Sequence, residues 1–261
     1  GDSLLGIHRL DQLTELAITP TGKGQQRLFG QNIARAVQEA VELRQRLRQM
    51  PIRDICDVEA MAQLDANARK KLEMPELIAD TFIGEMLASS GNISSVENAI
   101  ASLVIHASQA IDGDTNSIKA ITERAKLVLS IDLPAGMECR RAFHWPLEFP
   151  EVFVHESSGF DAVIGNPPFI GGRRMRGALG DAFLNWLICR WPHASLNADF
   201  CVFFYLQAAN LLRKNGGFGF IGTKTIGQGD SARTGLKFLR EHYEVETRHA
   251  ISSFIWPGSA A

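Results

Sequence analysis

The sequence predicts an α/β fold in which a partial parallel sheet is interrupted by a large all-helical insertion. Three short apolar stretches, at 160–165, 218–226 and 244–251, have the composition of buried strands. The stretch at 198–217 between the first two is predicted to be a long helix ended by a glycine pair. This order is typical of a doubly wound parallel sheet, whose ligands bind at the carboxyl ends of the strands.

Residues 27–131 have a different pattern. Ile33, Val37 and Ala40 recur at helical spacing with Arg and Glu between them, which predicts a surface helix with one buried face. Pro51 ends this helix, and Pro75 is expected to interrupt a later one. The block shows no strand pattern and no cluster of chemically active side chains. The chain is therefore divided into residues 1–26, a helical insertion at 27–131, and residues 132–261.

The composition is that of an ordinary water-soluble protein, with 45% hydrophobic residues among 261. There are 27 basic and 29 acidic residues, so any contact with nucleic acid requires a local patch. Four scattered cysteines without a Cys-x-x-Cys pair argue against a zinc site and a disulfide framework, and no metal is expected. The same cysteine pattern favours a reducing cytoplasm as the setting. The sequence shows no apparent leader or membrane span. Because the chain begins without Met, we interpret it as part of a longer protein.

The turn "NPPF", residues 166–169, directly follows the first predicted strand. Each proline fixes its own backbone and restricts the residue before it, so the turn is stiff. The side-chain oxygen of Asn166 and the carbonyl of Pro167 can converge on one amino group, while Phe169 offers a flat apolar face. A nucleobase with an exocyclic amine fits this arrangement. Two acceptors would localise the lone pair of an adenine N6 amine for attack on an activated methyl group.

"FDAVIGNPPFIGG", together with "FHWPLEFPEVF" upstream and "GGFGFIGTKTIGQGD" downstream, resembles the gamma-class adenine-N6 DNA methyltransferases. The resemblance is to the large methylase or methylase-nuclease proteins of type IIG-like restriction-modification and phage-defence systems. It covers residues 1–12 and about 139–261. It implies a Rossmann-like fold that uses S-adenosylmethionine, with the end of the cofactor-binding half at 1–26 and the catalytic half at 132–261. The implied partner is double-stranded DNA with a flipped adenine.

The resemblance also implies roles for individual residues. Asn166, Pro167, Pro168 and Phe169 match the catalytic motif, and Asp2 in "GDSLLG" matches the acid that contacts the cofactor's adenine. Phe254 matches a second aromatic residue that packs on the flipped base, and Trp256 is a rival for that role. The family's glycine-rich cofactor loop should precede "GDSLLG", and "TGKGQQR" at 21–27 is interpreted as an ordinary loop. The isolated chain is therefore expected to be inactive.

Other residues near the turn have alternative explanations. Arg173, Arg174 and Arg176 could hold DNA phosphates or form a solvated face. Asp199 could cap a helix or line the cofactor site, and His144 and His193 are expected to be structural.

Two other functions stay open: a non-enzymatic DNA- or partner-binding remnant of the same fold, and a protein-glutamine methyltransferase. A restriction nuclease and a target-recognition domain would lie outside this sequence.

Overall fold

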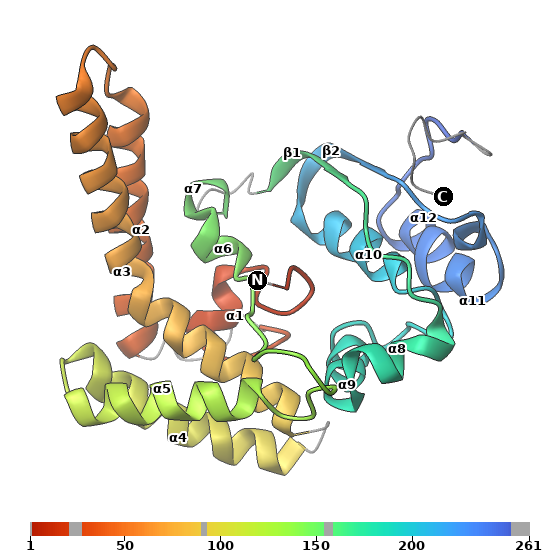
Figure 1. Ribbon diagram of the computed structural model, residues 1–261, viewed down its shortest axis with the longest axis horizontal. Coiled ribbons are helices and arrows are strands. Elements are labelled where there is room, and N and C mark those ends of the chain that lie inside the picture. The colour runs from red at the N-terminus through yellow and green to blue at the C-terminus, as the bar shows by residue number, and fades with distance from the viewer. Residues whose placement is uncertain (1, 21–27, 90–92, 154–158, 252–261) are drawn as a thin grey trace.

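The computed structural model describes residues 2–20, 28–89, 93–153 and 159–251 (Figure 1). The first half contains α1 (Leu10–Glu15), α2 (Leu28–Gln49), α3 (Ile55–Ala88), α4 (Ile93–Ile111) and α5 (Thr115–Leu129). The second half contains α6 (Trp145–Glu148), α7 (Pro150–Phe153), β1 (Phe160–Gly165), α8 (Gly172–Leu179), α9 (Asp181–Arg190), α10 (Cys201–Leu211), β2 (Leu212–Phe220), η1 (Lys224–Gly227), α11 (Gly229–Ala232), η2 (Arg233–Lys237) and α12 (Phe238–His242). Within the described residues, no helix is both long and apolar enough to span a membrane.

The described residues of the 27–131 block form the helices α2 to α5, and no strand lies among them. Helices α2 and α3 pack against each other as a long hairpin, and α3 also packs against α5 (Figure 1). Ile33, Val37 and Ala40 form the buried stripe of α2, as their spacing predicts.

The expected break at Pro75 is wrong, because α3 continues through it. A proline inside a helix costs about 3 kcal/mol. Pro75 itself is buried, and so are Leu72, Ile78 and Phe82 on either side of it. Burial of each large apolar side chain contributes roughly 1.5–3 kcal/mol, so packing outweighs the lost backbone hydrogen bond.

The N-terminal segment runs beside residues 141–145. Asp2 N donates to Arg141 O at 2.6 Å, and Phe143 N donates to Leu5 O at 2.7 Å. Directly after Leu5, Gly6 has a φ of +139°, and a Cβ there would lie 2.3 Å from Phe143 O. Glycine is therefore required where the two segments cross.

Strands β1 and β2 are parallel neighbours, and their register runs from Ala162 opposite Gly217 to Gly165 opposite Phe220. Helix α10 precedes β2 directly, and its Tyr205 ring packs on Phe220 with 4.9 Å between centroids. The described residues contain this parallel pair instead of the wider Rossmann-like sheet that we expected. The predicted burial of the first strand is also wrong, since Ile164 is 87% exposed. An apolar run does not reveal how many neighbours will cover the strand.

Two further predictions about the second half are wrong in part. The predicted helix at 198–217 ends at Leu211, because Leu212 becomes extended and begins β2 opposite Phe160. The predicted strand at 218–226 therefore ends at Phe220 and is followed by η1.

The third predicted strand, at 244–251, does not form. A strand requires a hydrogen-bonded neighbour, and these residues pair with no strand in the described parts of the chain.

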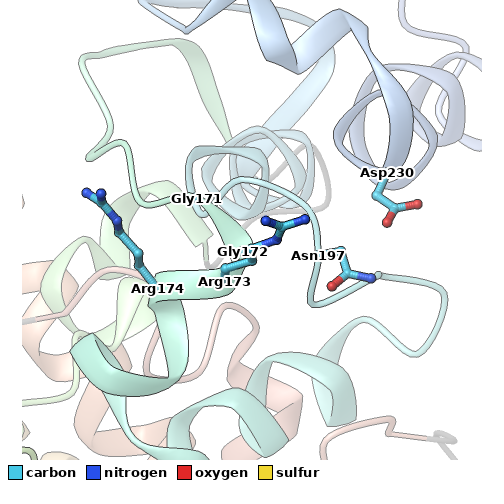
Figure 2. A pocket seen from close by; sticks show the side chains of 6 residues that line it. All are labelled: Gly171, Gly172, Arg173, Arg174, Asn197 and Asp230. Atoms are coloured by element: carbon cyan, nitrogen blue, oxygen red, sulfur yellow. The ribbon is translucent and has the colours of Figure 1, made fainter.

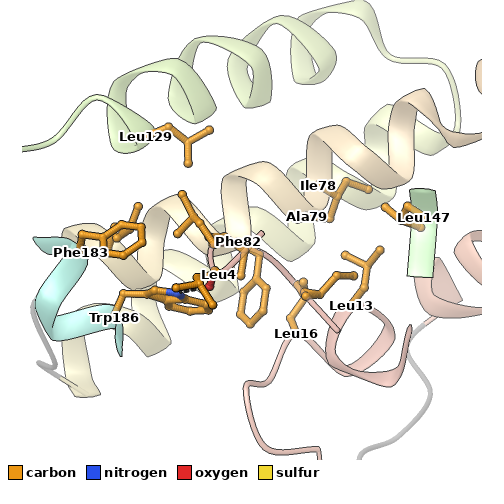
Figure 3. Packing of buried hydrophobic residues seen from close by; sticks show 14 of the residues in the cluster. Leu4, Leu13, Leu16, Ile78, Ala79, Phe82, Leu129, Leu147, Phe183 and Trp186 are labelled. Atoms are coloured by element: carbon orange, nitrogen blue, oxygen red, sulfur yellow. Dashed lines mark hydrogen bonds between the residues drawn. The ribbon is translucent and has the colours of Figure 1, made fainter. Parts of the chain in front are cut away.

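A continuous hydrophobic core joins the N-terminal segment, the helical block and α9. Leu4, Phe82 and Trp186 meet in it and are all almost fully buried (Figure 3). The indole Nε1 of Trp186 donates to Leu4 O at 2.9 Å, so the buried polar atom is satisfied.

The Glu76 carboxyl group on α3 provides a test of this packing. Burial, with the nearby carboxylates of Glu148 and Asp80, raises its pKa from 4.5 to about 7. The folded state holds this proton more tightly than the unfolded state, so the stability of the folded state falls as pH rises from 4.5 to about 7. Above pH 7, Glu76→Gln should therefore increase the free energy of unfolding by at most about 3 kcal/mol and so raise the unfolding temperature.

The gain should vanish near pH 4.5, where the carboxyl group is protonated in the folded protein. Thermal unfolding at both pH values measures it. Glu59→Gln, an exposed change on the same helix, is the control and should alter stability little at either pH. A loss of stability in Glu76→Gln above pH 7 would contradict this account.

Candidate active site at the carboxyl end of the first strand

Residues 166–170 form an irregular turn that is fixed at both ends. Gly165 O accepts a hydrogen bond from Ile221 N at 3.1 Å, and Ile170 O accepts one from Phe200 N at 2.8 Å. A Cβ at Gly165 would lie 2.8 Å from the Phe220 ring, so the strands approach closely there. The turn is therefore held between the end of β2 and the start of α10.

The side chains of this turn face different surroundings. Pro167 is buried, whereas Asn166 and Phe169 are exposed. The Asn166 side chain has no hydrogen-bond partner among the described residues. The Phe169 ring is 44% exposed and stacks on no other described ring. A stiff, anchored turn thus presents one amide and one aromatic ring to solvent.

The end of β2 contributes polar residues that sequence reasoning missed. Because Ile221 is bonded to Gly165, residues 222–225 begin at the same edge as the turn. The hydroxyl groups of Thr223 and Thr225 lie 2.6 Å apart, and the side chain of Lys224 is exposed. They were missed because the predicted strand extended to residue 226, which placed them inside it. Their signal was available, because the carboxyl ends of parallel strands meet at one edge.

A pocket of about 640 Å³ lies directly after the turn and is lined by Gly171, Gly172, Arg173, Arg174, Asn197 and Asp230. Figure 2 shows the Arg173 side chain extending toward Asn197, whereas that of Arg174 points the other way. Arg176, two residues after Arg174, does not line the pocket and forms an ion pair with Asp181. The structure thus separates three arginines that the sequence groups together.

The carboxylate in this pocket is already paired. Asp230 forms an ion pair with Arg233, which lowers the pKa of that carboxyl group, and the side chains of Asn197 and Ser195 lower it further. Arg173 and Arg174 form no ion pair with a described residue. The pocket therefore has net positive charge and suits an anionic group.

The family model for the Eco57I restriction-modification methylase matches residues 92–254, which is more than half of the chain. The chain belongs to the Eco57I restriction-modification methylase family. Membership supports a DNA methyltransferase of a restriction-modification system. No curated protein and no solved structure matches the chain. The matched region of this family member includes the 166–169 turn and the pocket, whereas Asp2, α2 and α3 lie outside it.

Asp2 of this Eco57I-family chain lies in the N-terminal segment, where it forms a parallel bridge with Ala142. One carboxylate oxygen accepts the Leu4 N–H at 3.0 Å, and burial raises the pKa of the group. No hydrogen bond joins Asp2 to the 166–169 turn within the described residues. Since a carboxylate has about four acceptor positions, Asp2 retains capacity for an amine of a bound adenine.

Three further residues singled out from the sequence each contact another described residue. Asp199, which precedes the N-cap residue Phe200, accepts the Cys201 N–H at 3.0 Å and so satisfies the first backbone donor of α10. His144 is buried, with Nε2 3.0 Å from an Asp80 oxygen and Nδ1 accepting from Ile7 N, and it is therefore structural. His193 stacks on Phe238.

Phe254, Trp256 and the 21–27 segment lie outside the described residues. The described part of the chain contains no group of three or more side chains suited to a metal ion.

Proposed function

We propose that this protein transfers a methyl group from S-adenosylmethionine to the N6 amine of adenine in double-stranded DNA, as part of a restriction-modification or phage-defence system. The observation that carries the proposal is the anchored turn after β1, with exposed Asn166 and Phe169 side chains and a buried Pro167. Family membership supports the coarser statement that the protein is a DNA methyltransferase.

In this proposal the turn acts on an adenine extruded from the duplex. The Asn166 side-chain oxygen and the Pro167 carbonyl each accept a hydrogen bond from the adenine N6 amine. These two hydrogen bonds localise the lone pair of the amine nitrogen. Phe169 stacks on the base, and Phe254 is proposed for its other face. Because Asn166 lies in a stiff turn, its backbone is in place before the reaction begins, and the two acceptors make a strong base unnecessary.

Methyltransferases of this kind generally use S-adenosylmethionine, which supplies an activated methyl group when bound. Asp2 is the residue that we assign to the cofactor's adenine. Its half-buried carboxylate can accept hydrogen bonds beyond the one from Leu4, so it can accept one from the amine of the cofactor's adenine.

The test is transfer of labelled methyl groups to unmethylated genomic DNA by the full-length protein. We expect label in DNA, recovered as N6-methyladenine after hydrolysis. DNA in which target adenines are already methylated should accept none. Label recovered in cytosine, or in a protein glutamine in place of DNA, would contradict the proposal.

DNA phosphates flanking the extruded adenine are proposed to contact the arginines after the turn. Sequence reasoning assigned this role to Arg173, Arg174 and Arg176, but the ion pair with Asp181 makes Arg176 less available. Arg173→Gln should reduce the slope of log DNA affinity against log salt concentration by about one, since one phosphate contact is lost. Arg176→Gln removes the same formal charge and is the matched control.

Fluorescence anisotropy with a labelled duplex over a range of salt concentrations measures both slopes. Equal losses in the two variants would show that the pocket does not distinguish these arginines.

A further inference from the structure

Arg190, the last residue of α9, is a buried cation with incomplete hydrogen bonding. Its Nη2 donates to the Gln207 side chain at 2.6 Å, and its guanidinium lies 4.8 Å from the Trp191 ring centroid. Its Nε and Nη1 are inaccessible to solvent and have no partner among the described residues. Buried donors are almost always paired, so two unpaired donors on one charged group indicate a missing acceptor.

His8, in the N-terminal segment, has the same deficiency, and the charge of Arg190 acts on its ring. Its Nδ1 is inaccessible and unpaired within the described parts of the chain. Burial, followed by the charges of Arg190 and Arg9, holds the pKa of His8 well below its ordinary value of 6.5. The ring is therefore neutral and carries one hydrogen, which either ring nitrogen can hold.

The positive charge of Arg190 has no carboxylate partner. None of the ion pairs formed by the described residues includes Arg190. Burial lowers the pKa of its guanidinium to about 9, and only the Tyr243 hydroxyl opposes this. An arginine in a protein does not lose its proton to relieve such a cost. An acceptor with negative charge would relieve it, because it would pair both the charge and the free donors.

We propose that Arg190 and His8 form a binding site for a small oxyanion, a phosphate or carboxylate group, where the N-terminal segment meets α9 and α10. Arg190 donates through Nε and Nη1, and His8 donates through Nδ1 in the tautomer that carries its hydrogen there. Both residues are only half-buried overall, so other atoms of each residue lie at the surface while these donors lie just beneath it. The site is separate from the residues proposed for methyl transfer and does not depend on that proposal.

The test is calorimetric titration of the protein with sodium phosphate at constant ionic strength. We expect saturable binding that weakens at least tenfold in Arg190→Gln and less in Arg190→Lys, which keeps the charge. Arg240→Gln, which removes an exposed arginine on α12, should bind phosphate like the wild type. Arg173→Gln should also do so, because its pocket is a different site.

A second measurement covers the case in which Arg190 variants fail to fold. In the wild type, phosphate should raise the pKa of His8, followed by nuclear magnetic resonance, because a bound anion favours the imidazolium. Acetate binding would extend the site to carboxylates, and competition by a short duplex would identify its ligand as a DNA phosphate. Absence of saturable phosphate and acetate binding, or binding lost in Arg173→Gln and retained in Arg190→Gln, would overturn the proposal.

Discussion

Replacement of Asn166 by alanine is expected to slow methyl transfer by a factor of about 10²–10³, the loss typical of one preorganised polar contact to a transition state. The turn is anchored on both sides through Gly165 and Ile170, so removal of an exposed side chain should leave its backbone in place. Affinity for DNA should change little, since phosphate contacts supply most of it. Single-turnover transfer of labelled methyl groups, with DNA binding measured in parallel, separates the two effects.

Asn166→Asp tests the mechanism within this position. The carboxylate keeps an acceptor at the same place and attracts both the amine hydrogens and the positive charge that develops on nitrogen. Its rate should therefore fall between those of the wild type and Asn166→Ala. Asn185→Ala, which removes an exposed amide on α9, is the matched control and should transfer at the wild-type rate. A wild-type rate in Asn166→Ala would show that the turn has a structural role and no role in catalysis.

The helical half of the chain could be predicted because helices are largely local. The stripe of Ile33, Val37 and Ala40 is visible in the sequence and is buried as expected. The error at Pro75 has a non-local cause, since the burial that sustains α3 comes from the surrounding helices. Local preference and tertiary packing disagree at that residue, and packing decides the outcome.

A strand forms only beside a hydrogen-bonded neighbouring strand, and the sequence does not show which segment will be that neighbour. The stretch at 160–165 forms a strand because 212–220 lies beside it, whereas the similar stretch at 244–251 forms none. The position of the 166–169 turn could still be predicted, because two prolines after an apolar run end a strand without ambiguity. Lys224 was missed, since the predicted strand ran to residue 226 whereas β2 ends at Phe220. The partnership of Arg176 with Asp181 likewise depends on how α8 meets α9.

Phe169→Ala is expected to weaken capture of the extruded adenine by roughly 1–3 kcal/mol, the value of stacking one base on an aromatic ring. Extrusion itself costs a few kcal/mol, so this loss can shift the flipped base largely back into the duplex. The ring is 44% exposed, so its removal should disturb the fold little.

Tyrosine and tryptophan at position 169 keep an aromatic face and should retain much more activity than alanine. Fluorescence of 2-aminopurine placed at the target position reports extrusion directly, and labelled transfer reports the consequence for the reaction. Leu127→Ala, which removes an exposed apolar side chain from α5, controls for loss of apolar surface and should change neither signal. Equal extrusion and transfer in the alanine and tyrosine variants would make Phe169 a packing residue, because only a stacking role distinguishes a ring from a methyl group at this exposed position.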